Sequence, residues 1–445
     1  MRQEQLTEKI PQPSVGLIEQ LRALFGVSLF RNSIYLILTS IVPAFTGFFF
    51  WTIAARIYTT AEIGLASSAI SIMTLLTLVS SLGLDIGLIR FISESISGGT
   101  KELLNTCFTV AGMVALVVSA VFVMGLKIWA PSLGLMRQDI VLPMAFVTIT
   151  VVFTVYSLLH YTFIARRRTE LSFTQTMVFS LVRFVPLILL SRYLHGFGIF
   201  IAWGSSSIIA MFTGFFLLKR IQPDYHPYFK VNTKILRDMR HFSIANYSVN
   251  LLWAAPGLIL PLMVVNRLGA ESGAYFYIAW AIASIILLIP PALSLSLFAE
   301  GTNNRKNLSD NVTRSLKMTI LLVGPAIALC FPLGKWVLSL FGHGYSANAT
   351  HLLWLLAIAA LPASLNQVYF SVQRVRERML YMVAINIFIA LMTLVLSYFL
   401  LPKMGIIGAG ISYLFAQTIP AAVVSVWLIN SKLMRNSDEY PITDQ

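Results

Sequence analysis

Two ionisable side chains lie inside long apolar runs of this 445-residue chain. Arg183 stands near the middle of the run 172–191, and Asp85 stands near the end of the run 63–89. A charge at the centre of a bilayer costs about 3 kcal/mol or more unless it faces protein or water, so such residues are candidates for function. Arg183 either lines a hydrated cavity as a fixed charge for an anionic group, or pairs with polar groups of a neighbouring helix. Asp85 is either a coupling site for H⁺ or Na⁺, or a pairing residue near the end of its run.

Four further residues could line such a cavity. Arg56 and Arg267 follow the ends of two runs, at matching places. Each is either an anchor at the membrane surface or part of a ring of positive charge at the mouth of the cavity. Asn250 lies inside a run, where it either holds helices together or meets sugar hydroxyls, and Trp51 lies inside another, where it either anchors the helix at the membrane interface or stacks on a sugar. The interpretations of Asn250 apply also to the amides Asn246, Asn366, Gln367, Asn386 and Gln417, and those of Trp51 to the rings of Trp253 and Trp280.

Prolines inside three of the runs predict bends. Proline removes a backbone hydrogen bond and kinks a helix, and in a membrane the neighbouring helices can satisfy the freed carbonyl groups. Pro43, Pro256 and the pair Pro290 and Pro291 are therefore predicted gating or kink positions.

Motifs for enzymatic chemistry are absent from the sequence. It contains no G-x-x-x-x-G-K phosphate loop, no H-E-x-x-H zinc motif and no cysteine cluster. Cys107 and Cys330 both lie in apolar runs, where we expect small buried hydrophobic side chains rather than a disulfide. We therefore expect no catalytic residue, no metal site and no cofactor, and an energy source that is an H⁺ or Na⁺ gradient or the substrate gradient itself.

The runs that carry these residues are long enough to cross a membrane. The chain is 57% hydrophobic and only 11% charged, against about 25% charged residues in a soluble domain. A spanning helix needs about 20 mostly apolar residues. Such runs occur at 33–55, 63–89, 105–129, 140–164, 172–191, 197–218, 241–265, 273–298, 316–340, 351–371, 379–401 and 405–429. We predict an all-α polytopic membrane protein with about twelve transmembrane helices.

The distribution of Lys and Arg predicts the topology. If both termini are cytoplasmic, the cytoplasmic tails and loops hold 24 of the 32 Lys and Arg residues, and the opposite side holds seven. This bias accounts for most of the net charge of +14, so the charge does not require a nucleic-acid partner. The predicted organisation is a cytoplasmic N-terminal segment 1–30, a six-helix bundle 31–218, a cytoplasmic linker 219–240, a second six-helix bundle 241–430 and a cytoplasmic tail 431–445.

The two predicted bundles resemble each other in sequence. An offset of 207 residues relates Phe163, Arg167, Glu170 and Gly198 to Phe370, Arg374, Glu377 and Gly405. One register across this stretch predicts a duplication. Because each half has six spans, the halves have parallel topology, and such repeats place the substrate site of a transporter at their interface.

Four stretches resemble a known family: 54–65 (AARIYTTAEIGL), 82–94 (LGLDIGLIRFISE), 165–168 (ARRR) and 275–301. They are similar to the polysaccharide transporters of O-antigen flippase type, in the multidrug/oligosaccharidyl-lipid/polysaccharide (MOP) flippase superfamily. The resemblance implies two six-helix bundles in a V around a central cavity. It also implies alternating-access transfer of a polyprenyl-(pyro)phosphate-linked oligosaccharide across the cytoplasmic membrane, with a cationic cavity in which Arg183 would fit. The implied partners are the lipid-linked glycan and membrane lipid, with a glycan polymerase or glycosyltransferases as further candidates.

Two other transporter classes have twelve spans. A MATE-like exporter of small molecules shares the fold but needs buried carboxylates, and this chain offers mainly Asp85. A major-facilitator-like transporter has a Gly-x-x-x-Asp-Arg-type loop, which 93–101 does not match. A non-transport scaffold would leave Arg183 unexplained. We therefore expect the flippase, with an ion-coupled small-molecule exporter of either class as the alternative.

Overall fold

The structure is a computed structural model that describes residues 28–94, 99–137, 140–291, 294, 297, 308–376 and 378–430. Residues 1–27 of the predicted N-terminal segment and the predicted tail 431–445 lie outside the described residues. Within the described part, all regular structure is helical, and twelve stretches are long and apolar enough to cross a membrane. The prediction of an all-α protein with twelve spans is confirmed.

The helices of the chain fall before and after a linker at residues 222–232. Those before it are α2 (Ser28–Ile57), α3 (Thr60–Ser81), α4 (Leu84–Glu94), α5 (Thr100–Met124), α6 (Leu126–Trp129), η2 (Pro131–Arg137), α7 (Val141–Ala165), α8 (Thr169–Val182), α9 (Phe184–Leu189), η3 (Leu190–Arg192) and α10 (His195–Ile221). Those after it are α11 (Thr233–Leu268), α12 (Ala270–Leu287), α14 (Leu308–Ser339), α15 (His343–Asn348), α16 (Thr350–Val375), α17 (Met379–Met404) and α18 (Ile406–Asn430).

Two of the predicted runs are each broken into two helices. The run 63–89 divides at Leu82 and Gly83, whose φ angles of 49° and 75° are left-handed and end α3 before α4 begins. The run 172–191 divides at Arg183, which separates α8 from α9. Hydropathy could not show either break, because both lie among apolar residues.

The linker is shorter than the predicted 219–240, because α10 and α11 extend into it from both sides. Asn232 caps α11, and its side chain accepts hydrogen bonds from the backbone N–H groups of Lys234 and Ile235. The linker lies along α5, where Asn105 accepts a hydrogen bond from the Tyr225 hydroxyl (2.8 Å).

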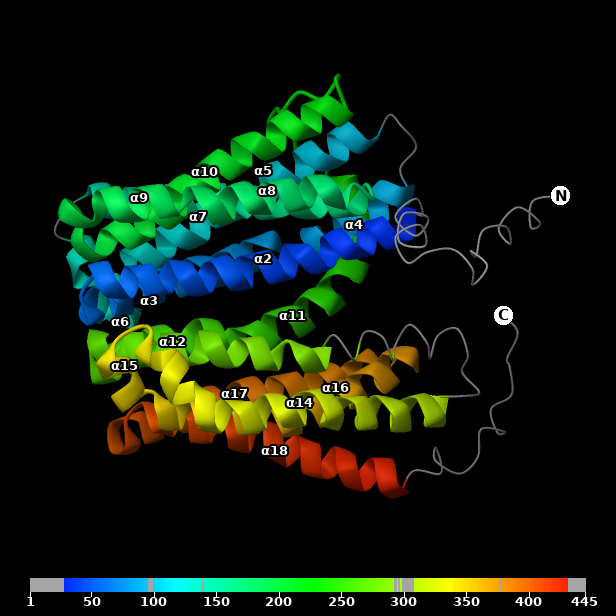
Figure 1. Cartoon of the computed structure of the whole chain (residues 1–445). Coiled ribbons are helices and arrows are strands. Elements are labelled where there is room, and N and C mark those ends of the chain that lie inside the picture. Colours follow the sequence, from blue (N-terminus) through cyan, green and yellow to red (C-terminus); the bar gives the residue numbers. More distant parts are fainter. Residues whose placement is uncertain are drawn as a thin grey trace, which may run out of the picture.

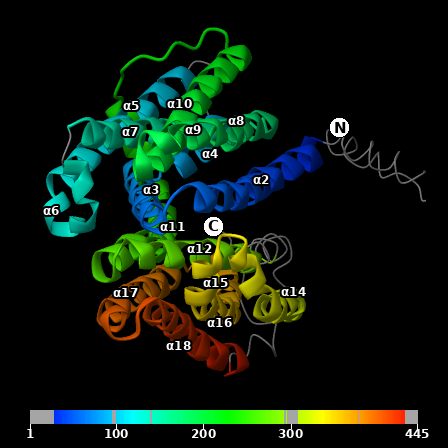
Figure 2. The same cartoon turned by 60° about the vertical axis from the view of Figure 1, so that its left-hand side comes forward.

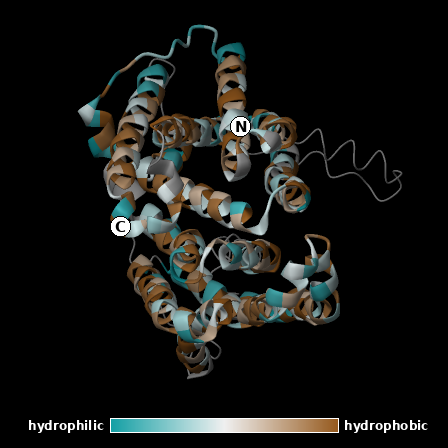
Figure 3. Cartoon of the chain, turned by 90° about the vertical axis from the view of Figure 1, so that its left-hand side faces the viewer, coloured by the Kyte–Doolittle hydropathy of each residue, from teal (hydrophilic) through white to brown (hydrophobic). Residues whose placement is uncertain are grey.

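The helices form two groups, one from each half of the chain. Figures 1 and 2 show α5, α7, α8 and α10 on one side and α14, α16, α17 and α18 on the other. α3 joins the groups, because it packs against both α11 and α12. Many outward side chains are large and apolar, such as Phe45, Phe212 and Val423, and Figure 3 shows hydrophobic residues along most of the helix surfaces. Such a surface suits a lipid solvent.

The two halves have the same order of long helices, and several equivalent helices are related by an offset of about 210 residues. α3 and α12 begin 210 residues apart, and so do α8 and α17. The turns before α8 and α17 also have the same hydrogen bond, in which Arg168 and Arg378 donate their backbone N–H to the carbonyl five residues earlier. The structure therefore supports the predicted duplication.

The predicted register of 207 residues is wrong by three. Gly198 lies against Leu190 as Gly408 lies against Leu400, so Gly198 matches Gly408 and not Gly405. The sequence match relied on Arg and Glu in polar turns. These side chains are tolerated at several positions of a turn, so they define the register less sharply than backbone packing does.

Candidate substrate cavity

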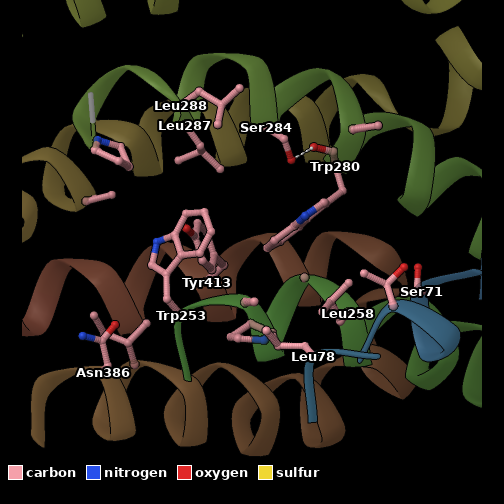
Figure 4. Close-up of a pocket in the computed structure, with 18 of the residues that line it drawn as sticks. Ser71, Leu78, Trp253, Leu258, Trp280, Ser284, Leu287, Leu288, Asn386 and Tyr413 are labelled. Atoms are coloured by element: carbon pink, nitrogen blue, oxygen red, sulfur yellow. Dashed lines mark hydrogen bonds between the residues drawn. The ribbon is translucent and has the colours of Figure 1, made fainter. Parts of the chain in front are cut away.

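A cavity of about 540 Å³ lies between the two halves, within the range of about 300–1,000 Å³ that is typical of small-molecule sites. Helices α3, α4, α7 and α10 line it from the first half. From the second half, α11, α12, α16, α17 and α18 contribute. Figure 4 shows some of the side chains that surround this space, including Ser71, Trp253 and Trp280.

The cavity lies where the repeat relates one half to the other. Along α3, and along α12 with the residues that directly follow it, lining residues pair at the 210-residue offset: Ile70 with Trp280, Ser71 with Ala281, Thr74 with Ser284, Thr77 with Leu287, Leu78 with Leu288, and Ser81 with Pro291. Trp203 on α10 and Tyr413 on α18 form another such pair. This is the position at which transporters built from repeats hold their substrates.

Helices α3, α11 and α12 close the cavity at one end. Gly64 of α3 faces Ala270 of α12 so closely that a Cβ atom on Gly64 would collide with the Ala270 carbonyl oxygen. The Ser68 hydroxyl donates to the Pro261 carbonyl oxygen of α11 (3.1 Å). All lining residues of α3 follow Ser68. The cavity therefore occupies the part of the molecule beyond this seal, toward the end where α2 begins and α18 ends (Figure 1).

Among the described lining residues, the one charged side chain is acidic. Asp85 lies in the first turn of α4, beyond the end of the membrane-spanning helix α3. It is 8% exposed, and its Oδ1 atom has no hydrogen-bond partner among the described residues. Burial raises the pKa of this carboxyl. The cationic cavity that the resemblance implies is thus not found in the described lining.

The second half contributes amides and aromatic rings to the lining. Asn366 Nδ2 donates to both the backbone oxygen and Oε1 of Gln417 (3.0 Å each). Asn386 Nδ2 donates to the Met382 carbonyl oxygen of its own helix (2.8 Å). The rings of Trp280 and Tyr413 meet edge to face, with centres 5.1 Å apart. These groups offer both donors and acceptors beside flat apolar faces.

Arg183 lies behind the cavity wall rather than on it. The residue is 1% exposed, and its Nη2 donates to Thr46 Oγ1 of α2 (2.9 Å). Its guanidinium carbon lies 4.9 Å from the ring centre of Phe50, 5.0 Å from that of Trp203 and 5.6 Å from that of Phe179. Trp203 lines the cavity and Arg183 does not, so the ring of Trp203 lies between the guanidinium of Arg183 and the cavity. These contacts fit the second interpretation, a guanidinium held by a neighbouring helix.

The two arginines predicted at the mouth of the cavity lie near the closed end. Arg56 donates two hydrogen bonds to the Leu340 carbonyl oxygen (3.2 and 2.9 Å), which joins the end of α2 to the end of α14. The guanidinium carbon of Arg267 lies 3.8 Å from the ring centre of Tyr398. Neither arginine is among the lining residues.

Trp51 and Asn250 also lie outside the lining. Trp51 is buried, and its ring meets the ring of the lining residue Tyr277 edge to face, with centres 4.8 Å apart. Asn250 is exposed on α11. Trp51 therefore supports the wall of the cavity from behind.

Three of the four predicted bend positions line the cavity. Pro256 lies inside α11, which curves along its length in Figure 1, and Pro290 and Pro291 follow the end of α12. Pro43 lies inside α2 and is not a lining residue.

Several lining aromatics are missing from the residues predicted from sequence, among them Trp203, Tyr277 and Tyr413. The repeat carries a signal for two of them, because Trp203 and Tyr413 are aromatic residues at equivalent positions once the register is 210. Tyr277 has no such signal. Within the described ranges, no three His, Cys, Asp or Glu side chains gather so that they could hold a metal ion, and Cys107 and Cys330 are free and buried.

Solved transporters of the MOP superfamily share this fold. The lipid II flippase MurJ, in an inward closed conformation, matches with a TM-score of 0.69 and 13% identity over 91% of this chain and 90% of MurJ. An inward-facing multidrug resistance MATE family transporter matches with a TM-score of 0.67 and 15% identity over 90% of this chain and 99% of its own. At these identities the similarity shows the fold, which is the MOP fold that the resemblance implies.

Sequence comparison identifies the family. A protein of Shigella flexneri named "Putative O-antigen transporter" is 28% identical over 172 residues, which are 37% of this chain and 40% of the relative. The chain thus spans less than half the length of this curated relative. The polysaccharide biosynthesis protein family matches residues 29–299, more than half of the chain. The chain is a multi-pass membrane protein that belongs to the polysaccharide biosynthesis protein family, and it shares the fold of solved MOP transporters.

Proposed function

We propose that the protein is a flippase that moves a polyprenyl-(pyro)phosphate-linked oligosaccharide across the cytoplasmic membrane by alternating access. Two findings support the proposal: the chain belongs to the polysaccharide biosynthesis protein family, and it shares its fold with a lipid flippase. The observation that carries the proposal is the cavity on the interface of the repeat, sealed at one end by Gly64 against Ala270.

The proposed cycle opens the seal and closes the other end of the cavity. α3 and α12 are equivalent helices that meet across the interface, so a rocking motion of the two halves changes both ends at once. Pro256, Pro290 and Pro291 line the cavity at positions where the backbone can bend. With both termini cytoplasmic, this conformation presents the cavity to the cytoplasmic side.

The glycan is the part of the substrate that we place in the cavity. The described lining offers hydroxyl, amide and aromatic groups and no cation. Phosphate groups pair with Lys and Arg, and 24 of the 32 such residues are predicted in cytoplasmic tails and loops. We therefore place the phosphates at the membrane surface.

We place ion coupling at Asp85. A buried carboxyl with an unpartnered oxygen is stabilised in one of two ways when the cavity is accessible: it takes up H⁺ and becomes neutral, or it stays ionised and binds a cation such as Na⁺. The predicted energy source, an H⁺ or Na⁺ gradient, would act through this group.

The proposed function is tested by depleting the protein in its native cells and extracting the polyprenyl-linked sugars. The flippase predicts that a complete oligosaccharide accumulates in the cytoplasmic leaflet. An unchanged amount and leaflet distribution would contradict the proposal.

An ion-coupled exporter of small molecules is the second candidate, favoured by one observation. The single charged group of the described lining is the carboxyl Asp85, which suits organic cations better than phosphates. Of the two exporter classes considered, the MATE type shares this fold. It predicts unchanged lipid-linked sugars on depletion together with increased sensitivity to cationic compounds.

A further inference from the structure

A cluster of four aromatic residues in the first half has smaller residues at the equivalent positions of the second half. In the first half, Phe153, Tyr156, Phe179 and Trp203 pack together. The residues 210 positions later in the second half are Ala363, Asn366, Ile389 and Tyr413. Each replacement is smaller, and one of them introduces an amide.

This difference makes the cavity asymmetric. In the first half, no residue of α8 is among the lining residues, because Phe179 of α8 is covered by the rings of Tyr156 and Trp203. In the second half, the equivalent helix α17 is reached by the cavity at Asn386 and Ile389. On this side the cavity therefore extends to residues of α11, α16, α17 and α18, and we call this part of the cavity the C-terminal pocket. Its lining residues are Trp253, Asn366, Asn386, Ile389, Tyr413 and Gln417.

Three amide side chains surround the C-terminal pocket and are almost fully buried: Asn366 is 1% exposed, Asn386 2% and Gln417 6%. Asn366 Oδ1 has no hydrogen-bond partner among the described residues. An unpaired buried polar atom is unfavourable, and Asn366 is a lining residue, so a ligand that donates a hydrogen bond to this oxygen would relieve the cost. A hydrocarbon chain in the pocket would leave that cost unrelieved.

Trp253 adds an apolar face to the same pocket. The residue is 51% exposed although it lies among lining residues, and Figure 4 shows its ring projecting from the ribbon with Asn386 and Tyr413 nearby in the view. A large exposed ring beside amides suits a ligand with one apolar face and a rim of hydroxyl groups. A pyranose ring has this shape.

We propose that the C-terminal pocket binds an uncharged sugar ring of the transported glycolipid. The inference rests on the proposed flippase function and adds the place and the class of sugar that is recognised. An acidic sugar is disfavoured, because no cation lies among the described lining residues and Asp85 is the single charge. The first half has no counterpart of this pocket, so recognition of the sugar belongs to the second half.

The test measures the rate at which the complete lipid-linked oligosaccharide reaches the outer leaflet, in cells depleted of the native protein and supplied with variants. Asn386→Leu and Gln417→Leu each remove an amide at similar volume, and each is expected to slow the rate by about threefold to tenfold. Ile389→Phe copies Phe179 of the first half, fills the pocket and is expected to slow the rate at least as much. The matched control is Thr176→Val, at the position equivalent to Asn386, which does not line the cavity and is expected to stay within about twofold of the unchanged protein.

The outcomes separate the alternatives. Slow rates for both amide variants and for Ile389→Phe, in protein that elutes as a folded monodisperse species in detergent, support the sugar site. Unchanged rates for both amide variants overturn it. If Ile389→Phe alone is slow, the pocket holds an apolar part of the lipid, which also overturns it. Failure of the proposed function looks different, because depletion of the unchanged protein would then not alter the leaflet distribution at all.

Discussion

Gly64 of α3 and Ala270 of α12 approach so closely that only a glycine fits at position 64, and this contact seals one end of the cavity between the two halves. The two helices are equivalent in the repeat, so the seal lies near the axis that relates the halves. In the proposed cycle, this contact opens and closes as the two halves rock.

Gly64→Ala is therefore expected to weaken the seal. The added methyl group collides with backbone rather than with a flexible side chain, and such overpacking costs about 1–3 kcal/mol. A cysteine introduced at Ser71 of the cavity should then become reachable for a membrane-impermeant thiol reagent from the sealed side. Gly112→Ala is the control, because its new Cβ would meet only Val151 Cγ1 at 4.0 Å. Equal labelling in the presence and absence of Gly64→Ala would contradict the account.

Asp85→Asn is expected to stabilise the described conformation at neutral pH. Burial raises the pKa of the Asp85 carboxyl in the folded protein, so its contribution to stability is full below its unfolded pKa of about 4 and is lost as the pH rises through the raised folded value. The groups within electrostatic reach on α7 and α11 are Tyr161 and Tyr247, both phenols. Thermal unfolding of both proteins between pH 4 and 8 measures the effect. The difference in melting temperature should grow with pH, and a constant difference would exclude titration of Asp85.

The variants Arg183→Ala and Arg183→Met should distinguish the contribution of the side chain's packing to stability from that of its charge. Truncation to Ala leaves a hole beside Phe50 and Trp203, and large-to-small changes in packed cores cost about 2–5 kcal/mol. This structure thus predicts reduced stability for the Ala variant. Met keeps most of the volume and removes a buried charge, so its stability should equal or exceed that of the unchanged protein.

The transport rate of Arg183→Met then reports the role of the charge. Loss of the cation–π contact with Trp203, worth about 0.5–2 kcal/mol, frees a ring that lines the cavity, and transport should fall severalfold. Full transport by a stable Arg183→Met protein would show that the charge has no part in it.

Asn105→Ala is expected to release the linker 222–232 from α5. Asn105 is 2% exposed; it accepts from the Tyr225 hydroxyl (2.8 Å) and donates to the His226 carbonyl oxygen (3.2 Å). Loss of these bonds should cost about 1–3 kcal/mol locally and speed proteolytic cleavage in the linker. Thr213→Ala on α10 serves as the control, because Thr213 is a half-buried residue whose hydroxyl donates to the Ile209 carbonyl oxygen of its own helix. Identical cleavage rates would contradict the prediction.

The fold could be predicted from sequence because lipid imposes one strong rule, that each span is a helix of about 20 apolar residues. The breaks at Leu82 and Arg183 could not be predicted in this way, since they depend on packing and leave the hydropathy unchanged. The spans of the repeat could be recognised from sequence, but its register could be determined only from the backbone packing and hydrogen bonds of the structure.

The site was harder to predict, because the lipid-facing and protein-facing sides of a helix are both apolar in a membrane. Four of the residues predicted from sequence do line the cavity: Asp85, Pro256, Pro290 and Pro291. Arg183 carries the positive charge expected for a phosphate site, but it points into a cluster of aromatic rings. The asymmetry of the pocket emerges only when residues such as Phe179 and Ile389 are compared at the correct offset.

The most direct test of the account is flipping by the purified full-length protein. The protein is reconstituted into liposomes with the polyprenyl-linked oligosaccharide extracted from depleted cells, and the fraction of glycolipid in each leaflet is followed over time. The account predicts exchange between leaflets well above that of protein-free liposomes, and slower exchange with Asn386→Leu. Exchange equal to that of protein-free liposomes, with and without an imposed H⁺ or Na⁺ gradient, would contradict it.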